Sequence, residues 1–278
     1  MKKLRGKLIA FLVILMAVLI GFGVTYYIRS SKTKVENEPT NVTQKKDDNK
    51  PEIVLKKYET PESVKKELKE KFDKLLGINK DTIGYIYAPG TQLDEPIVQT
   101  TDNEKYLNVT FEGENVPFLG SVFMDYENSK NFNDPLTWLF GHARGSKVVD
   151  HRMFNDVNFY ENQQYMDEHP FVVVETPERK HYYTVEFLIK VPEVTDLYRV
   201  DFADAKEFDE HIKKAASQAL VVANGAKMEG TSNYLILSTC REDNVEIRTN
   251  LYCREVSDYE LEDFLKKYGD KLEYKSTR

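Results

Sequence analysis

Cysteine is scarce in this chain: Cys240 and Cys253 are the only two among 278 residues. At most one disulfide is therefore available, and it would close a small loop of 12 intervening residues and occupy the cysteine that ends the apolar run YLILSTC. A disulfide is accordingly the less favoured interpretation, and a free thiol at Cys240 is expected. Because side chains alternate along a strand, Cys253 shares a face with Ile247 and Leu251. This predicts that Cys253 lies in the core.

Histidine is also sparse. Apart from His142, none of the five histidines has a neighbour at the spacing of metal ligands, and no metal site is predicted. Four of them stand in polar or helix-surface settings, and we expect these four on the surface: His151, His169, His181 and His211. The chain also has no internal repeat, which argues against a repeat architecture.

Acidic residues are missing from the N-terminus. The first 34 residues hold seven basic residues and no acidic one. The remainder therefore carries 32 basic against 46 acidic residues, a net charge of −14. Because nucleic-acid-binding domains present an excess of positive charge, this balance argues against a nucleic-acid partner.

An uncharged apolar run of 21 residues, Leu8 to Ile28, follows the basic start. It is long enough to cross a bilayer as a helix, and it ends in tyrosines that suit a membrane interface rather than in a small-residue cleavage site. The sequence therefore predicts a retained signal-anchor over residues 1–29, a polar flexible linker over 30–58 and a catalytic domain over 59–278. The corresponding location is the cell membrane, single-pass, with the catalytic domain extracellular.

The domain is predicted to be mainly β, with added helices. Short apolar segments bounded by turn residues predict strands at 83–88, 96–99, 120–125, 136–140, 171–175, 182–191, 234–239 and 247–256. Amphipathic helices are expected at 60–77, with Thr60 as N-cap, at 203–220 and at 258–268. Strands that outnumber helices and are joined mainly by short turns favour a closed mixed or antiparallel barrel of about eight strands.

Three side chains at strand ends form a candidate catalytic group. Cys240 ends one apolar run, Arg248 heads the next strand, and His142 follows the run LTWLF and a glycine. A thiolate near a cation attacks carbonyls, an imidazole transfers protons, and a guanidinium stabilises an oxyanion. Ser238 shares the face of Cys240 by strand alternation, and together with Thr239 it is a candidate substrate-binding residue.

Each member of this group also has a purely structural interpretation. Cys240 could be a small buried hydrophobe, although the charged residues after it argue against full burial. His142 could be a solvated loop histidine. Arg248 could pair only with Glu246 or Asp243, and the residues by themselves favour this pairing and a catalytic role about equally.

The chain resembles the class B sortases, a Gram-positive family of cysteine transpeptidases. The family signature is a TLxTC-type strand end with a downstream arginine; LSTC at the end of the run matches its last four positions, and Ile236 stands where threonine is usual. The resemblance extends from about Asn79 to Val256 through INKDTIGYIYAPGTQLDEPIVQTTDNEKYL, GSVFMDYE and LFGHARGSKVVDHRMFNDV. A helix before the first strand and a long helix between the late strands are closer to class B than to class A.

This resemblance implies that Cys240 is the nucleophile, His142 the general acid and base, and Arg248 the oxyanion and substrate contact. The implied reaction cleaves the C-terminal sorting signal of a secreted protein, NPxTN-like or a pilin variant, after threonine, and passes the acyl group from a thioester to an amine. The amine belongs to a cell-wall precursor peptide in surface protein anchoring or to a pilin lysine in pilus assembly. No cofactor is implied. The loop from Thr195 is expected to contact substrate.

Two other classes of function stay open. A cysteine endopeptidase would use the same thiol and imidazole but transfer the acyl group to water. A non-catalytic, membrane-tethered binding domain would retain the barrel, and its Cys240 would be unreactive. Product analysis with and without an added amine separates the first from transpeptidation, and Cys240→Ala separates the second.

Overall fold

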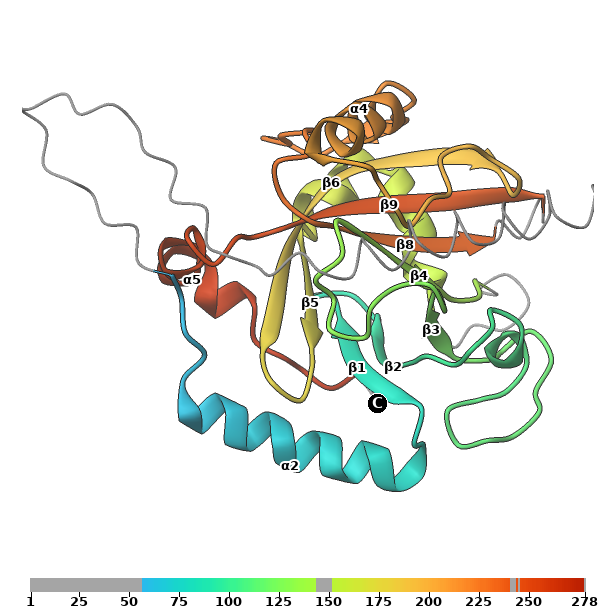
Figure 1. The fold of residues 1–278 in the computed structure, drawn as a ribbon, viewed down its shortest axis with the longest axis vertical. Coiled ribbons are helices and arrows are strands. Elements are labelled where there is room, and N and C mark those ends of the chain that lie inside the picture. Colours follow the sequence, from blue (N-terminus) through green and yellow to red (C-terminus); the bar gives the residue numbers. More distant parts are fainter. Residues whose placement is uncertain (1–56, 144–151, 241–243, 245, 278) are drawn as a thin grey trace, which may run out of the picture. The chain divides into compact units, whose positions relative to one another are not determined.

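The computed structural model describes residues 57–143, 152–240, 244 and 246–277, which form a β-barrel with helices on its outside (Figure 1). The helical elements are α2 (Glu62–Ile78), η1 (Lys105–Leu107), η2 (Asn155–Glu161), α3 (Gln163–Glu168), α4 (Ala205–Ala216), α5 (Leu261–Tyr268) and η3 (Gly269–Lys271). The strands are β1 (Thr82–Tyr87), β2 (Asp94–Val98), β3 (Val122–Met124), β4 (Leu136–Phe140), β5 (Phe171–Glu175), β6 (Lys180–Pro192), β7 (Val221–Val222), β8 (Tyr234–Cys240) and β9 (Ile247–Glu255).

The barrel closes because the two ends of one sheet meet. The strand order is β5-β1-β2-β3-β4-β8-β9-β6-β7, and β5 also pairs with β6, so that eight strands form a ring to which β7 is added. The pairs β2–β3 and β4–β8 are parallel, and the other pairs are antiparallel. The predicted mainly β fold, a closed mixed barrel of about eight strands, is confirmed.

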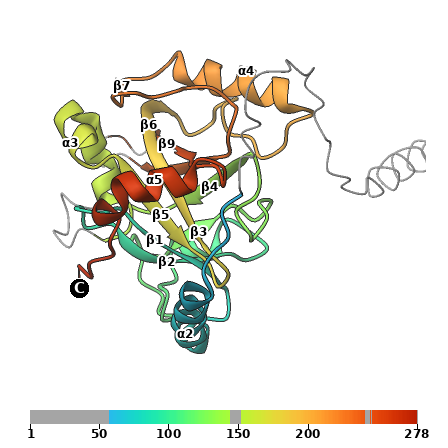
Figure 2. The same ribbon diagram turned by 90° about the vertical axis from the view of Figure 1, so that its left-hand side faces the viewer.

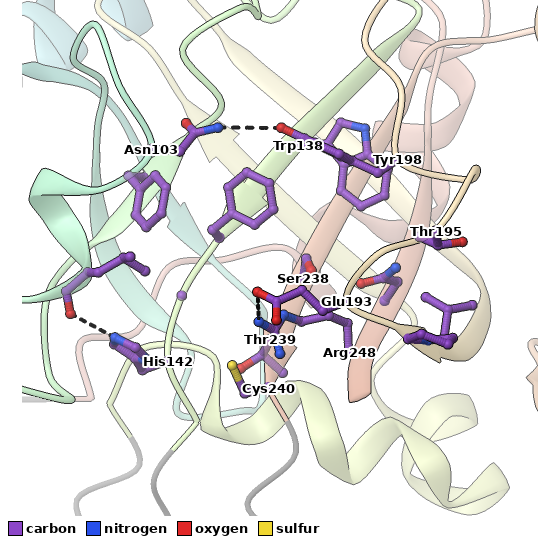
Figure 3. Close-up of a pocket in the computed structure, with 17 residues that line it drawn as sticks. Asn103, Trp138, His142, Glu193, Thr195, Tyr198, Ser238, Thr239, Cys240 and Arg248 are labelled. Atoms are coloured by element: carbon purple, nitrogen blue, oxygen red, sulfur yellow. Dashed lines mark hydrogen bonds and ion pairs between the residues drawn. The ribbon is translucent and has the colours of Figure 1, made fainter. Parts of the chain in front are cut away.

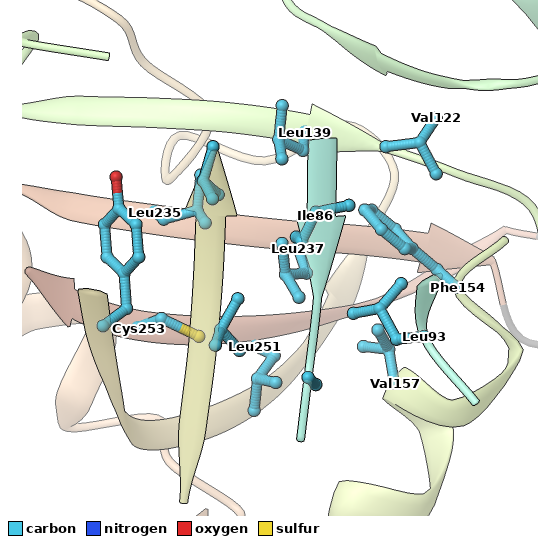
Figure 4. Packing of buried hydrophobic residues seen from close by; sticks show 14 of the residues in the cluster. Ile86, Leu93, Val122, Leu139, Phe154, Val157, Leu235, Leu237, Leu251 and Cys253 are labelled. Carbon is cyan, nitrogen blue, oxygen red and sulfur yellow. The ribbon is translucent and has the colours of Figure 1, made fainter. Parts of the chain in front are cut away.

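Strands β8 and β9 separate two apolar cores, because successive side chains point to opposite faces. The faces inside the barrel contribute Leu235, Leu237, Leu251 and Cys253, each with 0% of its surface exposed (Figure 4). The outer faces carry Ile236 and Tyr252, which pack with Trp138 and with Phe208 and Ile212 of α4. Cys253 is thus in the core as predicted, and burial raises the pKa of its thiol.

The other two long helices cover different parts of the barrel. Figure 2 shows α5 in front of β5 and α2 below it. Phe264 of α5 meets Phe171 of β5 edge-on at 5.5 Å between ring centroids. The helix α2 begins directly after Pro61 and has no side-chain cap, so the prediction of Thr60 as N-cap is wrong. The fixed φ of proline suits the entry to a helix without such a bond.

The predicted location in the cell membrane, single-pass and with an extracellular domain, is corrected. Among the residues that the structure describes, no helix combines the length and the apolar character needed to cross a bilayer. The longest, α2, has 17 residues and buries only Leu68 and Phe72. The predicted span itself, residues 8–28, lies outside the described residues, as does nearly all of the predicted linker.

The prediction that four histidines lie on the surface is wrong for two of them, and for a third, His151, it lies outside the described residues. His181 is 2% exposed, and its Nδ1 lies 2.8 Å from Oε1 of Glu255. His211 is 6% exposed on the packed face of α4, where its ring meets Phe202 at 5.1 Å between centroids. Burial, together with the positive charges of Arg199 and Lys214, lowers the pKa of His211 from 6.5 to about 4, and Asp196 offsets this only in part.

This depressed pKa predicts a loss of stability in acid. The unfolded chain binds a proton on His211 as the pH falls through 6.5, whereas the folded chain does so only near pH 4, so protonation favours unfolding between these values. Full loss would cost at most roughly 3 kcal/mol at 1.36 kcal/mol per pKa unit, and less where solvent screens the charge. We expect His211→Gln to flatten the pH dependence of the unfolding free energy between pH 7 and pH 4, measured by urea titration. His169→Gln controls for replacement of a histidine outside α4, and a wild-type slope in His211→Gln would contradict the prediction.

Candidate active site

The antiparallel pairing of β8 with β9 places Cys240 directly opposite Arg248. Side chains of such cross-strand partners have Cβ atoms about 5 Å apart and lie on the same face. Two residues further along the strands, Ser238 is opposite Asn250 on that same face. Cys240 is the last residue of β8, and it is half-buried. The sequence-predicted thiol and guanidinium are thus neighbours.

His142 reaches the same place from β4, which lies parallel to β8. The pairing of Phe140 with Ser238 continues through the N–H of Gly141, which donates to the Ser238 carbonyl at 3.3 Å. A Cβ at Gly141 would lie 2.9 Å from the Phe154 ring, so a larger residue would push His142 away from its position. The imidazole Nε2 lies 2.7 Å from the Leu107 carbonyl oxygen. Since a carbonyl only accepts, Nε2 carries the proton and Nδ1 is the basic nitrogen of the neutral ring.

These residues border one groove of about 250 Å³ (Figure 3). Cys240, His142 and Arg248 line it together, and part of its wall is aromatic, formed by Phe123, Trp138, Phe140 and Tyr198. Tyr198 meets the Trp138 ring edge-on at 5.2 Å between centroids. The cavity therefore combines apolar surface with a few polar groups, the usual composition of a ligand-binding site.

The loop that follows β6 forms one side of this groove and is attached to the barrel. The Tyr198 hydroxyl donates a hydrogen bond to the Asp125 carboxylate, which also accepts from Asn103 Nδ2 at 2.8 Å. The Trp138 Nε1 donates to the Arg199 carbonyl at 2.7 Å. Side chains on and directly after the adjacent strands β4 and β3 thus hold the loop in place.

Arg248 forms an ion pair that the sequence analysis did not consider. Its Nη2 lies 2.5 Å from Oε1 of Glu193, the residue directly after β6 (Figure 3). Glu193 in turn donates its backbone N–H to the Glu246 carbonyl at 2.8 Å, which continues the β6–β9 pairing. The guanidinium is therefore held beside the thiol by a carboxylate from a neighbouring strand.

The groove sets the protonation state of the Cys240 thiol by opposing effects. Burial raises its pKa most, the Arg248 charge lowers it, and the Glu193 charge raises it. The net direction is upward from the ordinary value of 9.0, so the thiol form dominates at neutral pH. This differs from the expectation of a cation-stabilised thiolate, because burial and the carboxylate outweigh the guanidinium.

The candidate substrate-binding residues fall on opposite faces. Ser238 is 4% exposed and faces the groove beside Cys240. Thr239 borders the groove, but its side chain and that of its partner Thr249 point to the other face of the sheet, because side chains alternate along a strand. The sequence analysis missed Asn103, Glu193 and Asn250, which also line the groove, whereas Tyr198 belongs to the loop from Thr195 that was expected to contact substrate. Alternation from Arg248 could have found Asn250. No group of three His, Cys, Asp or Glu residues in the described ranges is placed to hold a metal ion.

Known proteins share this architecture. Sortase B of Listeria monocytogenes is 30% identical over 180 residues, covering 64% of this chain and 70% of the relative. Sortase B of Staphylococcus aureus is 26% identical over 233 residues, covering 84% and 90%. The structure of a Staphylococcus aureus sortase B–substrate complex superposes with a TM-score of 0.61 at 23% identity, over 70% of this chain and 94% of that one. No family model matches the chain.

The barrel has the fold of the sortase B structures, and the 30% identity to a sortase B of which the chain covers 70% makes the protein a sortase-type cysteine transpeptidase. The similarity in sequence narrows the class further: the chain belongs to the class B sortase family. The resemblance seen in the sequence is therefore confirmed, and the protein is an enzyme of acyl transfer.

The charges in the groove predict opposite shifts of thiol reactivity. In a Cys253→Ala background, which leaves Cys240 as the only thiol, Glu193→Gln removes a negative charge and should lower the pH midpoint of alkylation by iodoacetamide. Arg248→Gln removes a positive charge and should raise it, with His142 and Tyr198 as further titratable groups on the groove. Mass spectrometry of the adduct gives the rates over a pH series from neutral to alkaline. Shifts of both variants in one direction would contradict the assigned charges.

Proposed function

We propose that Cys240 is the nucleophile, His142 the general acid and base, and Arg248 the oxyanion and substrate contact of this transpeptidase. The observation that carries the proposal is the cross-strand pair of Cys240 and Arg248 at a groove that His142 also lines. A nucleophile, a proton carrier and a charged hydrogen-bond donor around one cavity are the groups that acyl transfer needs.

In the first step the Cys240 sulfur attacks the carbonyl carbon of a threonine in the sorting signal. Because burial keeps the thiol protonated, its proton leaves as the S–C bond forms, and His142 accepts it. The carbonyl electron pair moves onto oxygen, and Arg248 donates hydrogen bonds to this oxyanion. When the C–N bond breaks, the imidazolium of His142 protonates the departing amine and a thioester remains.

In the second step an amine attacks the thioester. The attacking nitrogen gives a proton to His142 as its bond to carbon forms, and the proton passes to the Cys240 sulfur as the C–S bond breaks. One amide bond has then been exchanged for another, and the enzyme returns to its initial state. The steps need no electron transfer, so they require no redox partner.

The substrate we propose is a secreted protein with an NPxTN-like sorting signal or its pilin variant, and Ser238 contacts the signal in the groove. The acceptor is a primary amine, from a cell-wall precursor in surface protein anchoring or from a pilin lysine in pilus assembly. Two solved relatives support this chemistry: the Staphylococcus aureus sortase B–substrate complex and a sortase B complexed with triglycine, 25% identical to this chain with a TM-score of 0.61. Triglycine carries a free amine of the kind the second step needs.

We expect the purified full chain, incubated with an NPxTN-like peptide, to form a thioacyl adduct on Cys240, and to yield an amide-linked product when triglycine or a lysine peptide is added. Cys240→Ala should abolish both. His142→Ala and Arg248→Ala should slow product formation by about a hundredfold or more, since each removes a group that acts on the transition state. Mass spectrometry measures adduct and product.

Cys253→Ala is the matched control, because it removes the buried thiol and leaves the groove intact. Arg248→Lys keeps the positive charge but loses the planar guanidinium and its paired N–H donors. It therefore distinguishes the contribution of the charge from that of the hydrogen-bond geometry. Hydrolysis of the peptide despite abundant amine would instead identify a cysteine endopeptidase. Absence of any adduct in the wild type would indicate a binding domain.

A further inference from the structure

The backbone carbonyl of Cys240 lies just beyond the strand pairing that would bond it. Along β8 the Ser238 carbonyl points toward β4, where it accepts from the Gly141 N–H at 3.3 Å. Carbonyls two residues apart along a strand point to the same side, so the Cys240 carbonyl also points toward β4 and away from β9. However, the pairing of β4 with β8 stops at Phe140 and Ser238, and among the described residues the N–H groups after Gly141 do not continue it. The Cys240 carbonyl therefore needs a donor from elsewhere in the chain.

Asn158 supplies that donor. It belongs to η2, and its Nδ2 lies 3.4 Å from the Cys240 carbonyl oxygen. This length is that of a weak bond. The Asn158 Oδ1 is buried and has no hydrogen-bond partner in the described part of the chain, which costs free energy. The carboxamide therefore adds little to the stability of the fold, and its contact with Cys240 calls for another explanation.

The same segment also bonds to the chain at His142. Phe154, which comes directly before η2, donates its backbone N–H to the His142 carbonyl at 2.9 Å. Its ring lies where a Cβ at Gly141 would have to be, 2.9 Å away. Phe154 and Asn158 are four residues apart, so one short stretch of chain holds the backbone at both His142 and Cys240.

This stretch is itself fixed to the barrel by two buried carboxylates. The Met153 N–H donates to Oε1 of Glu95 at 2.7 Å, and Oδ2 of Asp156 accepts from the Gln92 N–H at 2.8 Å. Glu95 and Asp156 are 1% and 4% exposed, and Val157 packs into the core of the barrel. Reactive side chains keep a productive geometry when the residues that support them are locked in this way.

We propose that Asn158 is a positioning residue for acyl transfer: by bonding the Cys240 carbonyl it holds the thiol in line with the imidazole of His142. The proposal rests on the proposed transpeptidase function. In the first step the thiol passes its proton to the imidazole as the S–C bond forms, and the rate of such a transfer depends on alignment. Asn158 acts through the backbone of Cys240, since it is not among the residues that line the groove.

The test is Asn158→Leu, which has a similar volume and no donor. With an NPxTN-like peptide, the maximal single-turnover rate of thioacyl formation should fall by about tenfold or more, because misalignment of reacting groups is costly. The peptide concentration at half-maximal rate should stay near the wild-type value, since the groove residues are unchanged. The pH midpoint of Cys240 alkylation by iodoacetamide should also stay unchanged, because Arg248 and Glu193 are still in place.

The matched control is Asn162→Ala, four residues further along the chain. Asn162 caps α3 by accepting from the Tyr165 N–H at 3.1 Å, so its loss should lower the thermal midpoint and leave the acylation rate unchanged. Asn158→Leu should show the reverse, because removal of the unpaired oxygen offsets the lost bond. Asn158→Asp is a second variant of the same shape. Its ionised carboxylate cannot donate to the carbonyl, so it should also acylate slowly.

The outcomes separate this inference from the function on which it rests. Absence of a thioacyl adduct in the wild type would overturn the transpeptidase function itself. Wild-type acylation rates in folded Asn158→Leu or Asn158→Asp would overturn only the role of Asn158. A shifted alkylation midpoint in Asn158→Leu, or a loss of rate that follows a loss of thermal stability, would also overturn it by showing an effect on the charge of the thiol or on folding.

Discussion

The pairing of β8 with β9 is the constraint on which the rest of the structure depends. Seven consecutive residue pairs, from Tyr234–Arg254 to Cys240–Arg248, hold the two strands in a single register. Because side chains alternate along each strand, that register decides both which residues fill the barrel and which face the groove. A slip of β9 by one residue would bring Cys253 to the outside and turn Arg248 away from the thiol of Cys240. The core and the site are therefore determined by the same hydrogen bonds.

The outer face of these strands is divided between a helix and a cavity. The apolar side of α4 packs over Ile236 and Tyr252 and completes a second core. These two residues are as fully buried as those inside the barrel. Further along the same face, Ser238 and Asn250 give the groove a polar surface. Cys240 and Arg248 follow at its end. Burial raises the pKa of the thiol, the nearby guanidinium lowers it, and the carboxylate raises it. The extent to which α4 covers the outer face of the sheet therefore determines where the groove and its charged groups lie.

Local patterns predicted the elements well where apolar runs are bounded by turn residues. The segments 136–140 and 171–175 were expected with the bounds that the structure has. The helix expected at 203–220 is shorter, Ala205–Ala216, and Asp204 caps its start by accepting from the Glu207 N–H at 2.8 Å. The helical stretch 155–168 was missed, since its first part is a 3₁₀ turn without the period of an amphipathic helix. Most errors therefore concern ends and irregular turns.

The site could be predicted only in part from the sequence. Alternation and strand ends sufficed to bring Cys240 and Arg248 together, because the two are close along the chain. The partner of Arg248 was missed because Glu193 lies 55 residues before it and joins it only through the closing of the barrel. The buried state of His181 was missed for a similar reason, since its partner Glu255 is 74 residues away. Contacts of this kind arise from topology, which no local pattern contains.

The loop held by Tyr198 and Trp138 has a thermodynamic consequence for recognition. Its hydrogen bonds to Asp125 and from the indole to the Arg199 carbonyl exist before any peptide arrives. The conformational entropy of ordering that wall is thus lost during folding, and a bound peptide loses little affinity to immobilising it. The complex should accordingly form without a slow rearrangement of the wall, and its lifetime should depend on the contacts themselves. The free energy of folding therefore includes the cost of ordering the loop, and the free energy of binding does not.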